Sequence, residues 1–170
     1  ARREAASALV PFPAAISDPA LETARRDRSA QVREAAIAAL GRQGGAEAVA
    51  AARDATRDSS YSVQAAAIGA LIRLDSADRG SWVAHGLGTQ SYRDVIRNST
   101  LDAIARVGGA AYVAAVDSLR GESPRVANTL AILAVRGDST ALALRVRALD
   151  DPRPWVRDWT LRTVKRLPPA

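Results

Sequence analysis

Small apolar residues recur along the chain at helical spacing. The pattern is clearest in SAQVREAAIAALGRQGG, the segment from Ser29 to Gly45. Its apolar positions follow i, i+3, i+4, i+7 and i+8 spacing, which places them on one face of a helix: Val32, Ala35, Ala36, Ala39 and Leu40. Glycine tolerates the left-handed conformation that follows a helix, so we expect Gly41 and the pair Gly44-Gly45 to end it.

Copies of this segment return at a nearly fixed interval. Their anchor residues lie 31, 33, 30 and 30 residues apart, and they are Val32, Val63, Ile96, Val126 and Val156. A partial earlier copy from Arg2 to Leu9 places Arg3 30 residues before Arg33. A helical pattern that repeats every 31 residues or so is typical of a solenoid, whose units bury their apolar faces against their neighbours. The sequence therefore predicts an all-α fold, a right-handed α-solenoid of about five and a half helix pairs, in a single domain over residues 1–170.

Each repeat is expected to contain a helix, a tight turn and a shorter helix. In the first copy, Asp18-Pro19 predicts an N-cap and the first residue of a short helix. Gly69 is expected to let a neighbouring helix come close. Ser99 and Thr100 replace inward alanines, and their hydroxyls are expected to bond carbonyls within their own helix. After the first two, further helices are expected to start at Ser29 and at Asp58, to span 46–56, 77–87, 91–107, 110–119, 123–135 and 155–167, and in one case to end near Leu149.

Composition adds few constraints on chemistry. Of the 170 residues 38 are Ala, which favours close helix packing, and the net charge is +6 with Arg and Asp or Glu scattered along the chain. Cysteine is absent, so the chain has no disulfide or thiolate chemistry. No apolar run is long enough to predict a membrane span, and no feature indicates a compartment. The chain begins without Met inside a helical pattern, so we expect it to be an excised fragment of a larger protein.

Motifs for catalysis are missing from this sequence. A catalytic zinc site needs several His, Cys or carboxylate ligands, whereas His85 is the single histidine and has no His-x-x-x-His spacing. Neither a GxSxG nucleophile elbow nor a GxxxxGK[ST] phosphate loop is present. We therefore expect this fragment to be no enzyme and to hold no metal or cofactor.

The repeat motif carries a family resemblance. The pattern Asp-x-x-x-x-Val-Arg-x-x-Ala-x-x-Ala-Leu-Gly, from Asp27 to Gly41, resembles the short HEAT-like (lyase-type) repeats, which serve as binding scaffolds in unrelated proteins. The segment QSYRDVIRNSTLDAIARVGG, from Gln90 to Gly109, and the later LDDPRPWVRDWTLRTVKRL are similar to the C-terminal repeat domain of bacterial M1-family zinc aminopeptidases. This resemblance implies a non-catalytic domain that shapes access to an upstream active site. The HExxH and GxMEN motifs are absent, so zinc is implied only for the parent protein.

Two sets of charged residues follow from this scheme. The arginines of the Val-Arg pairs are expected to bond carboxylates or carbonyls at the turns between repeats and so to fix their register: Arg33, Arg97 and Arg157, with Asp27, Asp58 and Asp151 as partners. The shorter helices are expected to line an inner face directed at substrate, a preceding catalytic domain or another protein. Its candidate binding residues are Arg53, His85, Asp117, Arg120 and Arg145.

A second hypothesis assigns the chain to nucleic-acid chemistry. Trp155 and Trp159 are four residues apart on one helical face with Asp158 between them, and HEAT-like DNA glycosylases use aromatic and acidic residues in a basic concave cup. The alternative is therefore a free-standing nucleic-acid-binding protein or a glycosylase-like enzyme. Because acids lie among the arginines and would oppose a phosphate track, we expect a protein or peptide partner, no membrane and no nucleic acid.

Overall fold

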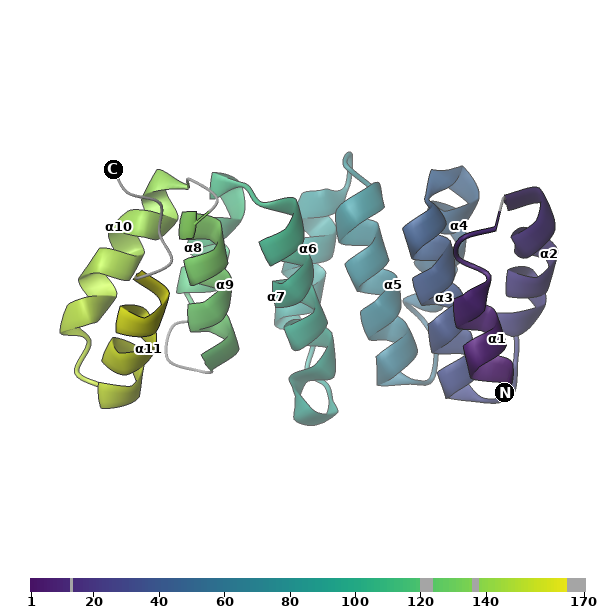
Figure 1. Ribbon diagram of the computed structural model, residues 1–170, viewed down its shortest axis with the longest axis horizontal. Helices are drawn as coiled ribbons and strands as arrows, with labels where there is room; N and C mark the ends of the chain where they lie inside the picture. Colours follow the sequence, from purple (N-terminus) through teal and green to yellow (C-terminus); the bar gives the residue numbers. More distant parts are fainter. Residues whose placement is uncertain (13, 120–123, 136–137, 165–170) are drawn as a thin grey trace. The chain divides into compact units, whose positions relative to one another are not determined.

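The computed structural model describes residues 1–12, 14–119, 124–135 and 138–164 (Figure 1). Helices are the regular elements in these ranges, and from α3 to α10 each longer helix is followed by a shorter one, as the repeat pattern predicts. The all-α solenoid of helix pairs is therefore confirmed, while its handedness stays a prediction. The α-helices are α1 Arg2–Ala8, α2 Ala14–Ala24, α3 Ala30–Gln43, α4 Gly45–Ala55, α5 Tyr61–Leu74, α6 Arg79–Gly88, α7 Val95–Val107, α8 Val113–Asp117, α9 Pro124–Val135, α10 Ser139–Arg147 and α11 Pro154–Val164. Three 3₁₀ turns in these ranges are η1 Tyr92–Asp94, η2 Ala110–Tyr112 and η3 Ala148–Asp150.

Contacts group the chain into two compact units, Ala1–Ala103 and Ile104–Ala170. The division falls within α7. Each unit is described by itself, and the expectation of a single domain over residues 1–170 stays a prediction.

The first unit is built around α3, which packs against α1, α2, α4 and α5, while α5 in turn packs against α4 and α6. Each helix pair thus buries its apolar face against the next pair, as a solenoid requires. Alanines make up much of the buried cluster, and Leu21, Ile37 and Leu71 are among its larger, fully buried members. Small side chains let the helix backbones approach closely, so the alanine-rich composition is used directly in the packing.

Three buried glycines mark the closest approaches between helices in this unit. A Cβ atom at Gly41 would lie 2.8 Å from the Cβ of Ala70, and one at Gly69 would lie 3.1 Å from Ser99 Oγ. A Cβ at Gly86 would lie 2.0 Å from Thr100 Oγ1, which is shorter than any real contact. The expectation that Gly41 ends its helix is therefore wrong. It lies inside α3, and Gly44, with φ +82°, is the residue that caps it.

Two further local expectations differ from the structure. Pro19 lies inside α2 rather than at its start, because the helix already begins at Ala14 and buries Ser17 and Leu21 on one face. Ser99 does not bond within its own helix but donates to the carbonyl of Ala65 in α5, at 2.8 Å. Thr100 does donate to the carbonyl of Ile96 within α7, at 3.0 Å.

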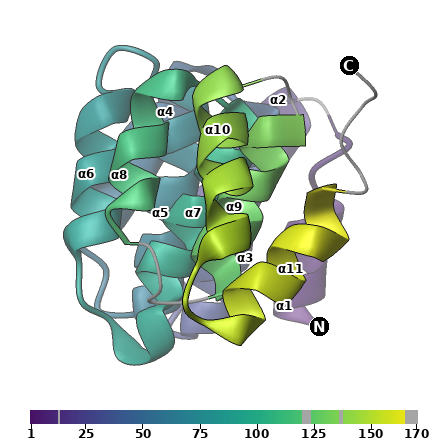
Figure 2. The same cartoon turned by 90° about the vertical axis from the view of Figure 1, so that its left-hand side faces the viewer.

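The second unit has a core of its own, which contains both alanines and larger apolar side chains. Its central helix is α9, which packs against α8, α10 and α11, and Figure 2 shows α10 in front, beside α9. Val113 and Val116 of α8 and Leu133 of α9 are among its fully buried residues. The helix expected over 110–119 is a 3₁₀ turn followed by the five residues of α8.

Candidate interaction surface

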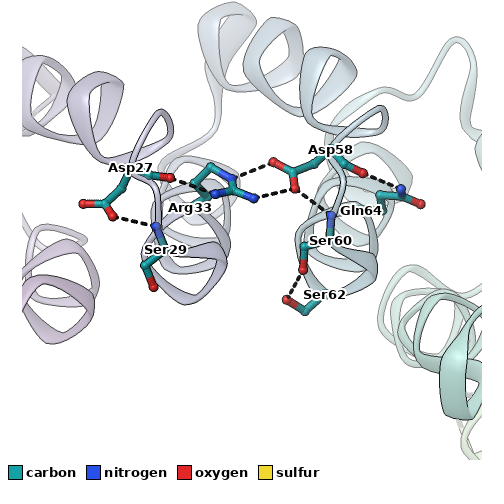
Figure 3. A network of polar contacts seen from close by, with 7 residues as sticks. All are labelled: Asp27, Ser29, Arg33, Asp58, Ser60, Ser62 and Gln64. Carbon is teal, nitrogen blue, oxygen red and sulfur yellow. Dashed lines mark hydrogen bonds and ion pairs between the residues drawn. The ribbon is translucent and has the colours of Figure 1, made fainter.

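A recurring polar motif precedes α3 and α5 (Figure 3). Asp27 Oδ1 accepts the backbone N–H of Ser29 at 2.8 Å, and Asp58 Oδ1 accepts that of Ser60 at the same distance. Both serines are N-cap residues with extended backbone, and neither forms a side-chain cap bond. The aspartate two residues before each cap therefore orders the turn that leads into the helix.

Arg33 connects one such motif with the next. Its Nε and Nη2 donate to the two carboxylate oxygens of Asp58, each at 2.8 Å, while Nη1 donates to the backbone carbonyl of Asp27 at 2.8 Å. This is a bidentate ion pair between half-buried groups, which is the strong form of the interaction. Figure 3 shows the guanidinium lying between the two aspartates. We call the residues Asp27, Arg33 and Asp58 the repeat clamp.

The repeat clamp has one further member towards the N-terminus. Arg2 Nε donates to Asp27 Oδ2 at 2.9 Å, and Nη2 donates to Oδ1 at 3.2 Å. The sequence separation is 25 residues, the same as between Arg33 and Asp58. Arg2 is therefore the residue of the first copy that corresponds to Arg33. The alignment of Arg3 with Arg33 was wrong by one residue.

Two later repeats keep the carbonyl bond of this motif. Gln64 Nε2 donates to the carbonyl of Asp58 at 2.6 Å, and Arg157 Nη1 donates to that of Asp151 at 2.7 Å, both across six residues. The carboxylate of Asp151 accepts from Arg153, at 2.8 and 2.7 Å. Arg97 donates to the carbonyl of Leu87 at 3.2 Å.

These contacts hold the aspartates in their charged form. The hydrogen bond from Arg33 lowers the pKa of Asp58, although its partial burial opposes this. The backbone N–H of Ser29, followed by the guanidinium of Arg2, lowers the pKa of Asp27. A carboxylate with a lowered pKa in the folded state contributes stability above its unfolded pKa, near 3.9 for Asp, and this contribution is lost as the pH falls through the folded value.

Acid should therefore destabilise the chain in part through Asp58. We expect the urea midpoint to fall between pH 6 and pH 3, because protonation of Asp58 breaks its pair with Arg33. In Asp58→Asn the decrease should be smaller, since that carboxylate no longer titrates. Urea unfolding, followed by circular dichroism at pH 6 and pH 3, measures the decrease in the wild type and in the variant. An equal decrease in wild type and variant would show that this aspartate does not contribute.

A second polar cluster lies where α4 meets the α5–α6 turn. Arg53 Nη2 donates to Asp75 Oδ2 and to Asp78 Oδ2, each at 2.7 Å. The Nε1–H of Trp82 also donates to Asp75 Oδ2, at 2.9 Å, and with Arg53 lowers the pKa of that buried carboxyl. The ring of the exposed His85 meets Trp82 edge-on at 6.4 Å between centroids. Of the predicted inner-face residues, Arg53 and His85 thus lie together around Trp82.

Arg145 and Asp117, two further predicted inner-face residues, differ in their burial. Arg145 is 2% exposed, and its Nη2 donates to the carbonyl of Trp159 at 3.4 Å, so it is not presented to a partner as expected. The reason is that α10 turns residues 141 and 145, one helical turn apart, towards the core. Asp117 is half-buried at the end of α8. Arg120 lies outside the described residues.

The aromatic pair of the last helix is divided between two environments. Trp155 is 37% exposed with Arg153 over its ring at 5.7 Å, whereas Trp159 is half-buried. Asp158 forms an ion pair with Arg162 at 2.9 Å. The two tryptophans and the acid therefore do not converge on one cup.

One small cavity in the first unit is lined by described residues. A cavity of about 160 Å³ lies among the ends of α2, α4 and α5 beside Asp58, against roughly 300–1,000 Å³ for typical ligand pockets. Among the same residues no group of three or more His, Cys, Asp or Glu is placed to hold a metal ion. Within the described ranges, no helix has the length and apolar character needed to cross a bilayer.

Sequence reasoning overlooked the loop between α6 and α7, residues 89–94. Tyr92 is 71% exposed there, and the guanidinium of Arg93 stacks on its ring at 5.3 Å. Arg93 and Asp94 both have φ of +54°, and they are the non-glycine residues of the described chain with positive φ. The one sequence signal was the missing aspartate: Thr89 stands two residues before Ser91, where Asp27 and Asp58 precede Ser29 and Ser60.

Comparison with known proteins agrees with the repeat pattern. A family model described as HEAT repeats matches residues 17–105, just over half of the chain. No curated protein matches the sequence significantly.

Proposed function

The chain belongs to the HEAT-repeat family, and on this basis we propose that it is a non-catalytic scaffold that binds another protein or protein domain. The repeat clamp is the observation that carries the proposal. Arg2 and Arg33, two arginines of the first unit, form ion pairs that hold one repeat on the next. They maintain an extended surface instead of forming a reactive centre, and such surfaces are what solenoids offer to partners.

The finer form of this proposal concerns the parent protein. The resemblance of Gln90 to Gly109 to the C-terminal domain of M1-family aminopeptidases supports a position after a zinc-dependent catalytic domain. The chain would then shape access to that active site, with His85 and its neighbours on the side facing it. Sequencing the gene upstream of Ala1 tests this directly. A preceding HExxH motif with a downstream Glu is expected, and its absence would overturn the aminopeptidase assignment while leaving the scaffold function intact.

The nucleic-acid alternative is favoured by one observation, the distribution of charge. Residues 104–170 contain eleven basic and six acidic residues, a net charge of +5, whereas residues 1–103 contain thirteen basic and twelve acidic residues, a net charge of +1. A concentration of positive charge attracts phosphates. However, Asp151 and Asp158 hold Arg153 and Arg162 in ion pairs, which weakens a continuous track.

The scaffold proposal predicts no saturable binding of a 20-base-pair DNA duplex at physiological salt. Fluorescence anisotropy with labelled duplex at 50 and 200 mM salt measures this. A nucleic-acid protein with 6–10 phosphate contacts would instead bind and lose roughly 10³–10⁵ in affinity between the two. Arg147→Glu, in the second unit, and Arg42→Glu, in the first, form a matched pair of exposed charge reversals. Tight binding abolished by the first variant alone would favour the alternative.

A further inference from the structure

The α6–α7 loop departs from the motif that orders the preceding turns. Thr89 replaces the aspartate, and its hydroxyl donates to the carbonyl of His85 at 2.7 Å. Gln64, at the position equivalent to Arg33, has no guanidinium with which to reach the next turn. The repeat clamp therefore stops before this loop, and the loop is held by other contacts.

Those contacts maintain an unfavourable backbone. Arg93 (φ +54°, ψ +27°) and Asp94 are successive residues in the left-handed region, where a side chain is disfavoured. The N–H of Asp94 donates to the carbonyl of Ser91 at 3.0 Å, and that of Ile96 donates to Ser91 Oγ at 3.1 Å. Asn98 Nδ2 adds a bond to the carbonyl of Arg93 at 3.3 Å. Strain that is held in place in this way is typical of functional segments.

The strained backbone presents two side chains that suit a protein interface. Tyr92, at 71%, is the most exposed of the large apolar and aromatic residues in the described ranges, and Arg93 stacks against it. Tyr and Arg are enriched among the residues that dominate binding energy at protein interfaces. Because the loop is already ordered, little conformational entropy remains to be lost on binding.

From these observations we propose that residues 89–94 form a contact loop for a folded partner protein, with Tyr92 as the central residue. The proposal rests on the scaffold function and names the surface that it uses. The matching site on the partner would contain an apolar pocket for the ring of Tyr92 and a carboxylate that reaches Arg93. A folded protein is favoured over nucleic acid because the first unit has a net charge of only +1, and Asp94 adds a negative charge beside Arg93.

Photo-crosslinking in the native host tests where the partner binds. The photoreactive residue p-benzoylphenylalanine is placed in the full chain at Tyr92 and, as a matched control, at Tyr61, which is 46% exposed at the start of α5. We expect one protein adduct at position 92 and little at position 61. A protein adduct at position 61 but none at 92 would overturn the contact loop alone. No protein adduct at either position would count against the scaffold function as well, and a nuclease-sensitive adduct would favour nucleic acid.

Affinity for the identified and purified partner then tests the role of each residue. Tyr92→Ala should weaken binding at least tenfold, as truncation of a central contact residue does, while Tyr61→Ala should change it less than twofold, by roughly the scatter among peripheral contacts. Asp94→Gly keeps Tyr92 and Arg93 but removes the strain at position 94, so it should raise the thermal unfolding midpoint and weaken binding about threefold through lost preorganisation. Unchanged affinity in Tyr92→Ala would overturn the proposal even if crosslinks form.

Discussion

Replacing Gly86 with alanine is expected to destabilise the chain by about 2–3 kcal/mol, at the upper end of the usual cost of overpacking. The new Cβ would lie 2.0 Å from Thr100 Oγ1 and 3.0 Å from Ile68 Cγ2. Both neighbours are fully buried, and the Thr100 hydroxyl is already bonded to the carbonyl of Ile96. Neither side chain can move aside without disturbing α5 or α7, so a small local movement cannot relieve the clash.

Urea unfolding of the full chain measures this loss, and the same helix offers a control. A Cβ at Gly80, also in α6, meets no atom within 4 Å, so Gly80→Ala should be neutral or stabilise by up to about 1 kcal/mol through helix propensity. The double variant Gly86→Ala with Thr100→Ala should recover part of the loss, because the clashing oxygen is gone. Equal effects of the two single glycine variants would contradict the close approach of α6 and α7.

The three close-packed glycines show which part of the fold could be predicted. The 3.6-residue pattern and the 31-residue interval predicted the helix pairs, because both depend on local sequence. The role of each glycine depends on what lies opposite, which a single sequence does not show. Gly69 was correctly expected at a close approach, Gly41 was assigned to a helix end, and Gly86 was not singled out.

The candidate surface was predictable to a similar degree. Some bonds join a side chain to the backbone carbonyl six residues earlier, as from Arg157 to Asp151 and from Arg33 to Asp27. They follow from local geometry and can be expected from the motif. Bridges to the next repeat depend on register, which is why Arg2 rather than Arg3 reaches Asp27. Helix order placed Arg145 on an exposed face, but its position one turn after Ala141 buries it. The strained loop escaped prediction because backbone conformation at Arg93 and Asp94 is unusual for their residue types.

Loss of the guanidinium in the repeat clamp should have the second large effect. We expect Arg33→Ala to destabilise the chain by about 2–3 kcal/mol, since a half-buried charged group and a carbonyl lose their partner together. Asp58 has 15% of its side chain exposed, so water can only partly replace Arg33. The carbonyl of Asp27 loses its bond as well. Urea unfolding at pH 7 and low salt measures the change.

The chain supplies its own control for this prediction in the next repeat. Gln64 makes the carbonyl bond without the bidentate pair, so Gln64→Ala should cost only about 1 kcal/mol, the value of one neutral hydrogen bond. Arg33→Gln imitates that natural arrangement and should fall between the two. Adding Asp58→Asn to Arg33→Ala should restore part of the stability by removing the unpaired charge. If Arg33→Ala costs no more than Gln64→Ala, the ion pair does not hold the repeats together, and the scaffold must depend on apolar packing alone.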